Sequence, residues 1–166
     1  MPATPDDLFA FLDRLGIPHK TATHPPLFTV EQSQSLRGSI PGGHTKNLFL
    51  KDKKDAVFLL VAPEHATIDL KSLHHRLGAG RFSFGSADLM RALLGVEPGA
   101  VTAFGVINDT AHRVNVVLDA GLMQHAIINC HPLTNTMTTS IGRDDLLKFF
   151  AATGHTPRIE VLAPSN

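Results

Sequence analysis

The sequence has a single cysteine, no excess of either charge and no long hydrophobic run, and each absence excludes a class of protein. Cys130 is the only cysteine among 166 residues, so no internal disulfide can form and we expect a reducing compartment. Fifteen basic side chains balance fifteen acidic ones, which excludes a broad binder of polyanions. The apolar run AVFLLVA, residues 56–62, is too short to span a bilayer.

The amino terminus and the length favour one intracellular domain. The opening stretch, MPATPDDLFAFL, lacks the basic region and the long apolar core of a signal peptide. A chain of 166 residues is long enough to bury one core, and no repeat, low-complexity tract or linker divides it. We therefore expect a single cytoplasmic domain over residues 1–166, monomeric and without membrane contact.

Capping residues and apolar spacing predict several helices. In residues 4–16, Thr4 stands at the N-cap position, Pro5 follows at the first helical position, and Gly16 lies beyond the end. The other predicted helices are residues 29–38, 69–78, 86–95 and 142–154.

Short apolar segments between turn residues predict strands at residues 17–24, 46–51, 56–62, 79–85, 100–107, 113–119, 125–130, 134–140 and 158–162. Two of these segments flank the turn DKKD, which indicates an antiparallel hairpin. Because strands mostly follow one another without strict alternation with helices, we predict an α/β protein of the mixed α+β kind. Its core would be a mainly antiparallel, barrel-like sheet with helices packed outside.

A lysine opens the first strand of this hairpin. In an extended segment Lys46 shares one face with two leucines, beside a glycine-rich loop, so its ammonium group could lie at the mouth of an apolar pocket. The alternative is that Lys46 extends to water from the strand end. Three further lysines belong to the hairpin turn, where solvated charges are common: Lys51, Lys53 and Lys54.

Familiar catalytic motifs give no support to a metal enzyme or a serine esterase. The sequence contains no HExxH, CxxC or GxSxG motif, and we expect no metal and no cofactor. Neighbouring residues of a strand point to opposite faces, so Cys130 and His131 do not suit a nucleophilic pair. Gly99 either lets the backbone approach a ligand or serves a turn, and Arg81 either binds a phosphate or forms a surface ion pair.

Three stretches together resemble the YbaK-like family of aminoacyl-tRNA editing domains, which includes the insertion domain of bacterial prolyl-tRNA synthetases. They are GGHTKNLFLKDKK, GAGRFSFGSADLMRALLGVEPGAVTAFGVIND and INCHPLTNTMTTSI, and they come in the family order. The likeness runs over nearly the whole chain and is close to the free-standing branch that deacylates alanyl-tRNA(Pro). It implies a YbaK-like fold with a pocket for the aminoacyl-adenosine end of tRNA.

The resemblance also implies roles for individual residues. Lys46 matches the essential lysine of the family, Asn47 follows it as in this branch, and His131 matches the pocket histidine of the HPL motif. These three form the expected catalytic set. Arg81 matches a basic residue that helps to hold the acceptor end.

A loop of five residues falls where the family carries a GxxxP motif that shapes the pocket. Here the stretch reads GAVTA, so Ala103 replaces the proline, a departure that bears on the rigidity of the loop and on substrate preference. The expected pocket residues are Gly99, Ala100, Val101, Thr102 and Ala103.

The expected function is therefore trans-editing, the hydrolysis of the ester of mischarged Ala-tRNA(Pro). The partners would be the acceptor end of tRNA(Pro) and, transiently, prolyl-tRNA synthetase or an elongation factor. A local basic patch would contact the tRNA through Lys51, Lys53, Lys54, Lys71, Arg76 and Arg81. Two alternatives stay open: a deacylase for Cys-tRNA(Pro), and a module that binds tRNA or a synthetase without catalysis.

Overall fold

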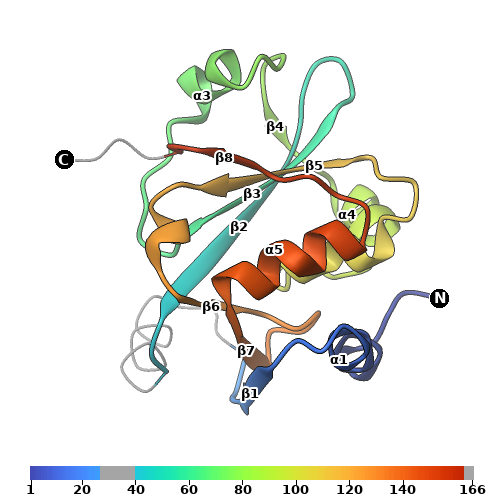
Figure 1. Cartoon of the computed structure of the whole chain (residues 1–166). Helices are drawn as coiled ribbons and strands as arrows, with labels where there is room; N and C mark the ends of the chain where they lie inside the picture. Colours follow the sequence, from blue (N-terminus) through green and yellow to red (C-terminus); the bar gives the residue numbers. More distant parts are fainter. Residues whose placement is uncertain (27–39, 163–166) are drawn as a thin grey trace.

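The computed structural model describes residues 1–26 and 40–162, and within them the strands form one mixed sheet of eight (Figure 1). The order is β1-β7-β6-β2-β3-β5-β8, and β4 also pairs with β2. The strands are β1 (His19–Thr23), β2 (Gly43–Lys51), β3 (Val57–Pro63), β4 (Ser83–Phe84), β5 (Val114–Asp119), β6 (Ile127–Cys130), β7 (Met137–Gly142) and β8 (Arg158–Glu160).

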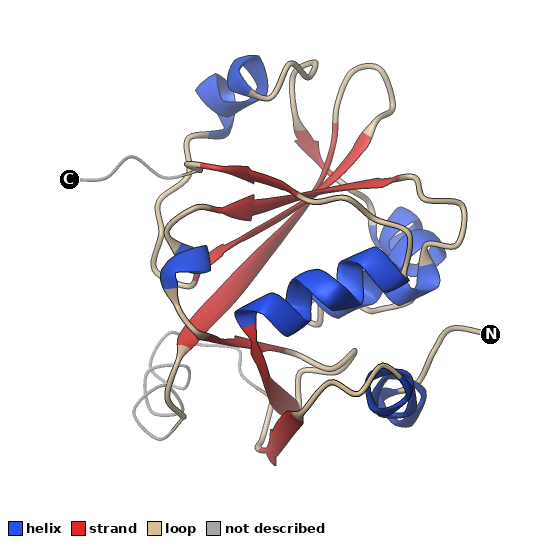
Figure 2. Ribbon diagram, in the orientation of Figure 1, coloured by secondary structure: helices blue, strands red, loops and turns tan. Residues whose placement is uncertain are grey.

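The helices lie outside the sheet, as expected (Figure 2). They are α1 (Pro5–Arg14), α3 (Leu70–Arg76), α4 (Ala87–Leu94) and α5 (Arg143–Ala152), with short 3-10 helices η1 (Ala103–Asn108) and η2 (Leu122–Gln124). The Thr4 side chain accepts from the Asp7 amide while the Asp7 carboxylate accepts from the Thr4 amide, so a capping box starts α1. The helix expected at residues 29–38 lies outside the described residues.

Strand β2 joins two parts of this sheet: β6, β7 and β1 lie on one side of it, and β3, β5 and β8 lie on the other. One of its edges pairs antiparallel with β3 from Thr45 to Lys51, which confirms the predicted hairpin. Its other edge pairs parallel with β6 at Gly43 and His44, and antiparallel with β4 at Leu50 and Lys51. Between these two pairings, no strand within residues 1–26 and 40–162 pairs with the second edge of β2.

The two faces of β2 enter two different hydrophobic cores. Phe49 belongs to the larger core, which α1, α4, α5 and η1 share with the sheet. Leu50 belongs to the smaller core, which α3 covers on the opposite face. Successive side chains of a strand point to opposite faces, so the alternation along this strand fixes both cores at once. Figure 1 shows α5 in the angle between the two parts of the sheet.

The prediction of a strand at residues 100–107 is wrong. Residues 100–102 are irregular, and the 3-10 helix η1 begins at Ala103. The Thr102 hydroxyl accepts a hydrogen bond from the Phe104 amide at 3.3 Å and so caps the helix. All four residues 103–106 are buried, and a short apolar run that is buried on every side has no period that separates a strand from a helix.

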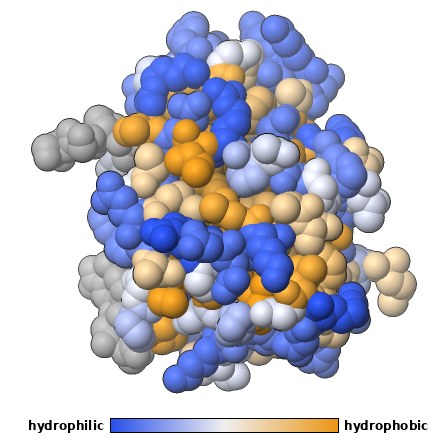
Figure 3. Space-filling view, viewed as in Figure 1, coloured by the Kyte–Doolittle hydropathy of each residue, from blue (hydrophilic) through white to orange (hydrophobic). Residues whose placement is uncertain are grey.

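The face of the molecule in Figure 3 is mixed, with hydrophilic residues mainly around the periphery and hydrophobic residues across the middle. Apart from Met1, the exposed large apolar residues among those described are Phe84, Ile127, Ile159 and Val161. None of the helices in the described ranges is long and apolar enough to cross a membrane.

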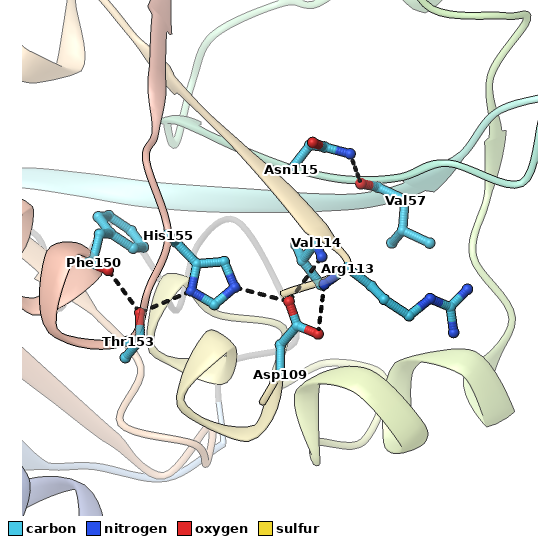
Figure 4. Close-up of polar contacts among 8 residues, drawn as sticks. All are labelled: Val57, Asp109, Arg113, Val114, Asn115, Phe150, Thr153 and His155. Atoms are coloured by element: carbon cyan, nitrogen blue, oxygen red, sulfur yellow. Dashed lines mark hydrogen bonds and ion pairs between the residues drawn. The ribbon is translucent and has the colours of Figure 1, made fainter. Parts of the chain in front are cut away.

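A buried polar network joins the loop after η1 to the loop after α5 (Figure 4). His155 Nε2 donates to Asp109 Oδ2 at 2.8 Å, and the Asp109 carboxylate also accepts from the backbone amides of Arg113 and Val114. Thr153 Oγ1 lies 2.9 Å from His155 Nδ1 and donates to the Phe150 carbonyl. Because the side chain of Asp109 is fully buried, its charge depends on these donors.

Replacing Asp109 by alanine should therefore destabilise the protein strongly. The change orphans two backbone amides and a buried imidazole, and we expect the free energy of unfolding to fall by about 3–5 kcal/mol. Urea denaturation followed by circular dichroism measures this loss, with the exposed His65→Ala as a control that changes little. Equal stability of the two variants would contradict the assigned role of the network.

Candidate active site

A cavity of about 300 Å³ opens where β2 passes from β6 to β3. Four consecutive residues of β2 line it: His44, Thr45, Lys46 and Asn47. The opposite wall comes from the ends of β6 and β7, from His131 in the connection between them, and from the loop before η1. Most of the cavity lies beside the stretch of β2 whose second edge pairs with no strand among the described residues.

Lys46 lines the cavity and is half-buried. Its ammonium group donates a hydrogen bond to the carbonyl oxygen of Ala66, in the loop between β3 and α3. Lys46 stands opposite Ala62 of β3, on the face that carries the smaller core, as strand parity predicted. Held in this way, a positive charge stands beside the cavity instead of extending freely into solvent.

Asn47 and Glu64 add polar groups to the same cavity. The side-chain oxygen Oδ1 of Asn47 is buried and accepts no hydrogen bond from any described residue. A buried carbonyl without a donor is costly, so it is suited to a donor that a ligand or water brings. Glu64 is the only carboxylate that lines the cavity among the residues described here, and its backbone amide donates to the His44 carbonyl.

His131 is held as a neutral imidazole with a defined tautomer. Its Nδ1 donates to the Met137 carbonyl at 3.0 Å, because a carbonyl can only accept, and this leaves Nε2 with the lone pair. Burial lowers the pKa of His131, and the nearby charge of His24 lowers it further. The hydrogen bond to the Met137 carbonyl and the charge of Glu64 raise it, but the net shift of the pKa is downward. The two histidine rings lie 6.3 Å apart.

The expected pocket loop contributes two of its five residues to the cavity, Gly99 and Val101. Gly99 has φ +94°, and the Ala100 amide donates to the Glu97 carbonyl, an arrangement typical of a turn whose third residue requires glycine. The other three, Ala100, Thr102 and Ala103, are buried behind the wall. The Thr102 hydroxyl donates to the His131 carbonyl at 2.6 Å, so the loop and His131 are fixed to one another.

Cys130 also lines the cavity, and its thiol is neutral. Burial raises the pKa of Cys130 to about 12, although the Thr45 hydroxyl, 3.8 Å from the sulfur, acts in the opposite direction. A neutral thiol is a poor nucleophile. In the described parts of the chain, no three His, Cys, Asp or Glu side chains gather as metal ligands would.

The basic residues expected to contact tRNA lie outside the cavity. Lys51, Lys53 and Lys54 occupy the hairpin end of β2, and Arg81 precedes β4, which pairs with that same end. Two others lie on α3, where the Arg76 side chain donates to the Val161 carbonyl and Lys71 is exposed.

Sequence reasoning missed the residues that complete the wall from distant segments. Asn129 is buried and donates to the carbonyls of Pro41 and Gly43, and Thr138 Oγ1 lies 2.8 Å from His24 Nε2. Glu64 was missed as well. The HPL and TKN motifs locate one wall each, but the other contributions depend on tertiary structure that no local pattern encodes.

These features define a small polar cavity beside a fixed ammonium group, a neutral imidazole and a glycine turn. The sequence model of the aminoacyl-tRNA editing domain family matches residues 24–149, so the chain belongs to that family. The match confirms the expected resemblance, the mixed fold with helices outside the sheet, and the enzyme class, an aminoacyl-tRNA hydrolase.

Individual relatives point in the same direction. The chain is 41% identical over 155 residues to prolyl-tRNA synthetase associated domain-containing protein 1 of Danio rerio, covering 92% of this chain and 84% of that protein. It is 35% identical over 150 residues to prolyl-tRNA editing protein ProX of Acetoanaerobium sticklandii, covering 90% of this chain and 92% of that one. A crystal structure described as a candidate trans-editing enzyme for prolyl tRNA synthetase has the same fold, with TM-score 0.74, 18% identity and coverage of 99% and 100%.

The raised pKa of Cys130 leads to a direct test of the cavity wall. We expect the thiol of the folded protein at pH 8 to react with a disulfide reagent roughly 1000-fold more slowly than that of the urea-unfolded chain, because little thiolate is present. Stopped-flow absorbance with Ellman's reagent measures both rates, and Cys130→Ala supplies the blank. Fast reaction of the folded protein would show that the thiol is not buried.

Proposed function

We propose that this protein hydrolyses the ester of tRNA(Pro) mischarged with alanine, acting in trans on the free aminoacyl-tRNA. The observation that carries the proposal is the convergence of Lys46, Asn47, Gly99 and His131 on one small cavity in a member of the editing family. Its relatives include proteins named for prolyl-tRNA editing. The tRNA acceptor end is the partner, and any contact with prolyl-tRNA synthetase or an elongation factor is transient.

The proposed reaction needs no nucleophile from the protein. An aminoacyl ester is already activated, so a positioned water and electrostatic stabilisation of the carbonyl suffice. Water adds to the acyl carbon, the bond to the ribose oxygen breaks, and a proton passes to that oxygen. Lys46 orients the ester or the terminal phosphate, and the neighbouring ribose hydroxyl helps to activate the water.

The backbone of the glycine turn supplies the oxyanion donors in this proposal. The Ala100 amide is engaged with the Glu97 carbonyl, whereas the amides of Gly99 and Val101 donate to no acceptor within the described residues. Both residues line the cavity, and backbone amides in such a position suit the charge that develops on the carbonyl oxygen. Their placement on a fixed turn means that little reorganisation accompanies the reaction.

Asn47 holds the other end of the amino acid. Its buried Oδ1 lacks a donor among the described residues, and the α-ammonium group of an aminoacyl ester supplies one. Both residues line the same cavity, so this contact fixes the ester relative to Lys46.

Specificity follows from size. A synthetase site built for proline rejects the smaller alanine poorly, because each missing methylene is worth only about 1–3 kcal/mol. A second cavity that admits alanine and excludes proline removes the error. Preference for Cys-tRNA(Pro) is the alternative within the same class, and a non-catalytic tRNA- or synthetase-binding module is the alternative outside it.

Deacylation of Ala-, Cys- and Pro-tRNA(Pro) tests the proposal directly. We expect the wild type to cleave the alanyl ester selectively, and Lys46→Ala to lose about 100- to 1000-fold in kcat/KM, because it loses the charge beside the ester. Lys148→Ala is the matched control, since Lys148 also donates to a backbone carbonyl, that of Leu15, but on the exposed surface. Its rate should not change.

The other outcomes are equally informative. Faster cleavage of the cysteinyl ester would keep the class and change the substrate. Tight tRNA binding with protection of all three esters would favour the binding module, and full activity of Lys46→Ala would overturn the assigned role of the lysine.

The neutral state of His131 predicts the pH dependence of the catalysed rate. Because burial lowers the pKa of His131 below the usual imidazole value of about 6.5, the ring is neutral at pH 7 and becomes protonated only in more acidic solution. If neutral Nε2 accepts the hydrogen bond of the water, kcat should be constant near pH 7 and fall as the pH drops through the His131 pKa.

Two variants separate this titration from acid unfolding. His24→Ala removes a charge that lowers the pKa of His131, so the acid limb should move to higher pH, while His131→Ala should lose the limb with most of the activity. Rates are corrected for uncatalysed hydrolysis, and circular dichroism monitors folding at each pH. An acid limb that does not move in His24→Ala would assign the titration to another group.

A further inference from the structure

Phe84 is an aromatic side chain that the fold holds in solvent. It is 67% exposed, although it stands in the regular pairing of β4 with β2. Single exposed apolar residues are common on proteins, so exposure alone assigns nothing. What distinguishes Phe84 is its position relative to the cavity and the charges around it.

Phe84 and the cavity lie along the same edge of β2. Phe84 pairs with Leu50, and β4 and β6 occupy the edge of β2 that β3 leaves free. Lys46 and Leu50 are four residues apart on one face of the strand, so Phe84 projects from the face that carries Lys46. At about 3.3 Å per residue, the ring lies roughly 13 Å along the strand from the lysine.

Basic residues lie at the same end of the sheet as this ring. Arg81, three residues before Phe84, is exposed and makes no ion pair or hydrogen bond with the described residues. Lys53 lies against the segment before β4, since a Cβ built on Gly80 would stand 3.3 Å from the Lys53 Cβ. Lys51 pairs with Ser83, so its side chain leaves the opposite face of the sheet from Phe84.

The buried carboxylate of Asp52 fixes the hairpin turn to the segment that precedes β4. Its Oδ2 accepts from the Gly80 amide and its Oδ1 from the amides of Lys54 and Ala56, each at 2.9 Å. Burial acts to raise the pKa of Asp52, but these donors outweigh it and the pKa lies below the ordinary value. These hydrogen bonds of Asp52 hold the lysines of the hairpin turn and Arg81 of the segment before β4 at the same end of the sheet.

We propose that Phe84 is a stacking platform for an unpaired nucleobase of the tRNA acceptor end, with Lys53 and Arg81 contacting the adjacent phosphates. This inference rests on the proposed function. An aromatic ring beside basic side chains is the arrangement that binds single-stranded nucleotides without reading their sequence. At a stacked rise of about 3.4 Å per nucleotide, 13 Å accommodates about four nucleotides, which is the length of the unpaired 3′ end of tRNA.

Because the chain carries no net charge, stacking would supply part of the affinity for tRNA. The formal net charge of the chain is zero, so long-range attraction to tRNA is weak and the few local cations cannot supply the whole affinity. A stacked base contributes in proportion to its contact with the ring and is little affected by salt. The platform thus binds the base nearest the acceptor stem while the terminal adenosine and its ester enter the cavity.

Binding of an uncharged acceptor-stem hairpin with a four-nucleotide 3′ overhang tests the platform without reference to catalysis. We expect Phe84→Ala to raise the Kd about 5- to 150-fold, Phe84→Trp to retain wild-type affinity, and Phe84→Leu to bind weakly because it lacks a π face. Ile159→Ala on β8 is the matched control for an exposed apolar residue and should bind normally. Fluorescence anisotropy at several salt concentrations supplies each Kd.

The salt series and a blunt hairpin separate stacking from charge. Phe84→Ala should keep the wild-type slope of log Kd against log salt, whereas Arg81→Ala and Lys53→Ala should each reduce it by about 0.7. A blunt hairpin should bind all Phe84 variants equally. Equal affinity of wild type and Phe84→Ala for the overhang hairpin would overturn the platform.

Kinetics distinguish failure of the platform from failure of the proposed function. For Ala-tRNA(Pro), Phe84→Ala should raise KM with little change in kcat, and for alanyl-adenosine it should change neither. If the wild type hydrolyses both esters and the variant matches it on both, the platform is wrong and the deacylase stands. If the wild type cleaves neither ester, the proposed function falls, and the anisotropy result alone then supports or overturns the platform.

Discussion

The organisation of the site depends on one constraint, the interrupted edge of β2. Its first edge pairs with β3 from Thr45 to Lys51, but within the described residues its second edge pairs with β6 only at the beginning and with β4 only at the end. A continuous neighbour there would satisfy the backbone and fill the space that the cavity occupies. Because the strand is paired at both ends and along its first edge, Lys46 and Asn47 are held in place beside the cavity, as a preorganised site requires.

Much of the fold follows from local signals. The capping box at Thr4 and Asp7 is visible in the sequence, and so is the hairpin around residues 52–55, because caps and tight turns act over a few residues. The face of Lys46 followed from strand parity alone. The proposal that Lys46 takes part in catalysis, however, comes from the family resemblance, since parity described an extended surface lysine equally well.

What the sequence concealed are contacts between distant segments. The wall of the cavity needs Glu64 after β3, Asn129 on β6 and Thr138 on β7, and the parallel pairing of β6 with β2 that gathers them leaves no local signature. The 3-10 helix η1 was mistaken for a strand because Phe104 and its neighbours are buried on every side. Such environments are set by what packs around a segment, so its own residues do not reveal them.

The position of the cavity and of the Phe84 edge on a single strand separates two tasks. In the proposed function, contacts at Lys46 and His131 act on the ester and therefore on the rate, whereas contacts near Phe84 are remote from the reacting atoms and act on affinity. A net charge of zero suits such a separation, since a strongly basic surface would hold every tRNA, correctly charged or not. Under this proposal, weak and local recognition lets correctly charged tRNA leave, and the size of the cavity then decides which ester is hydrolysed.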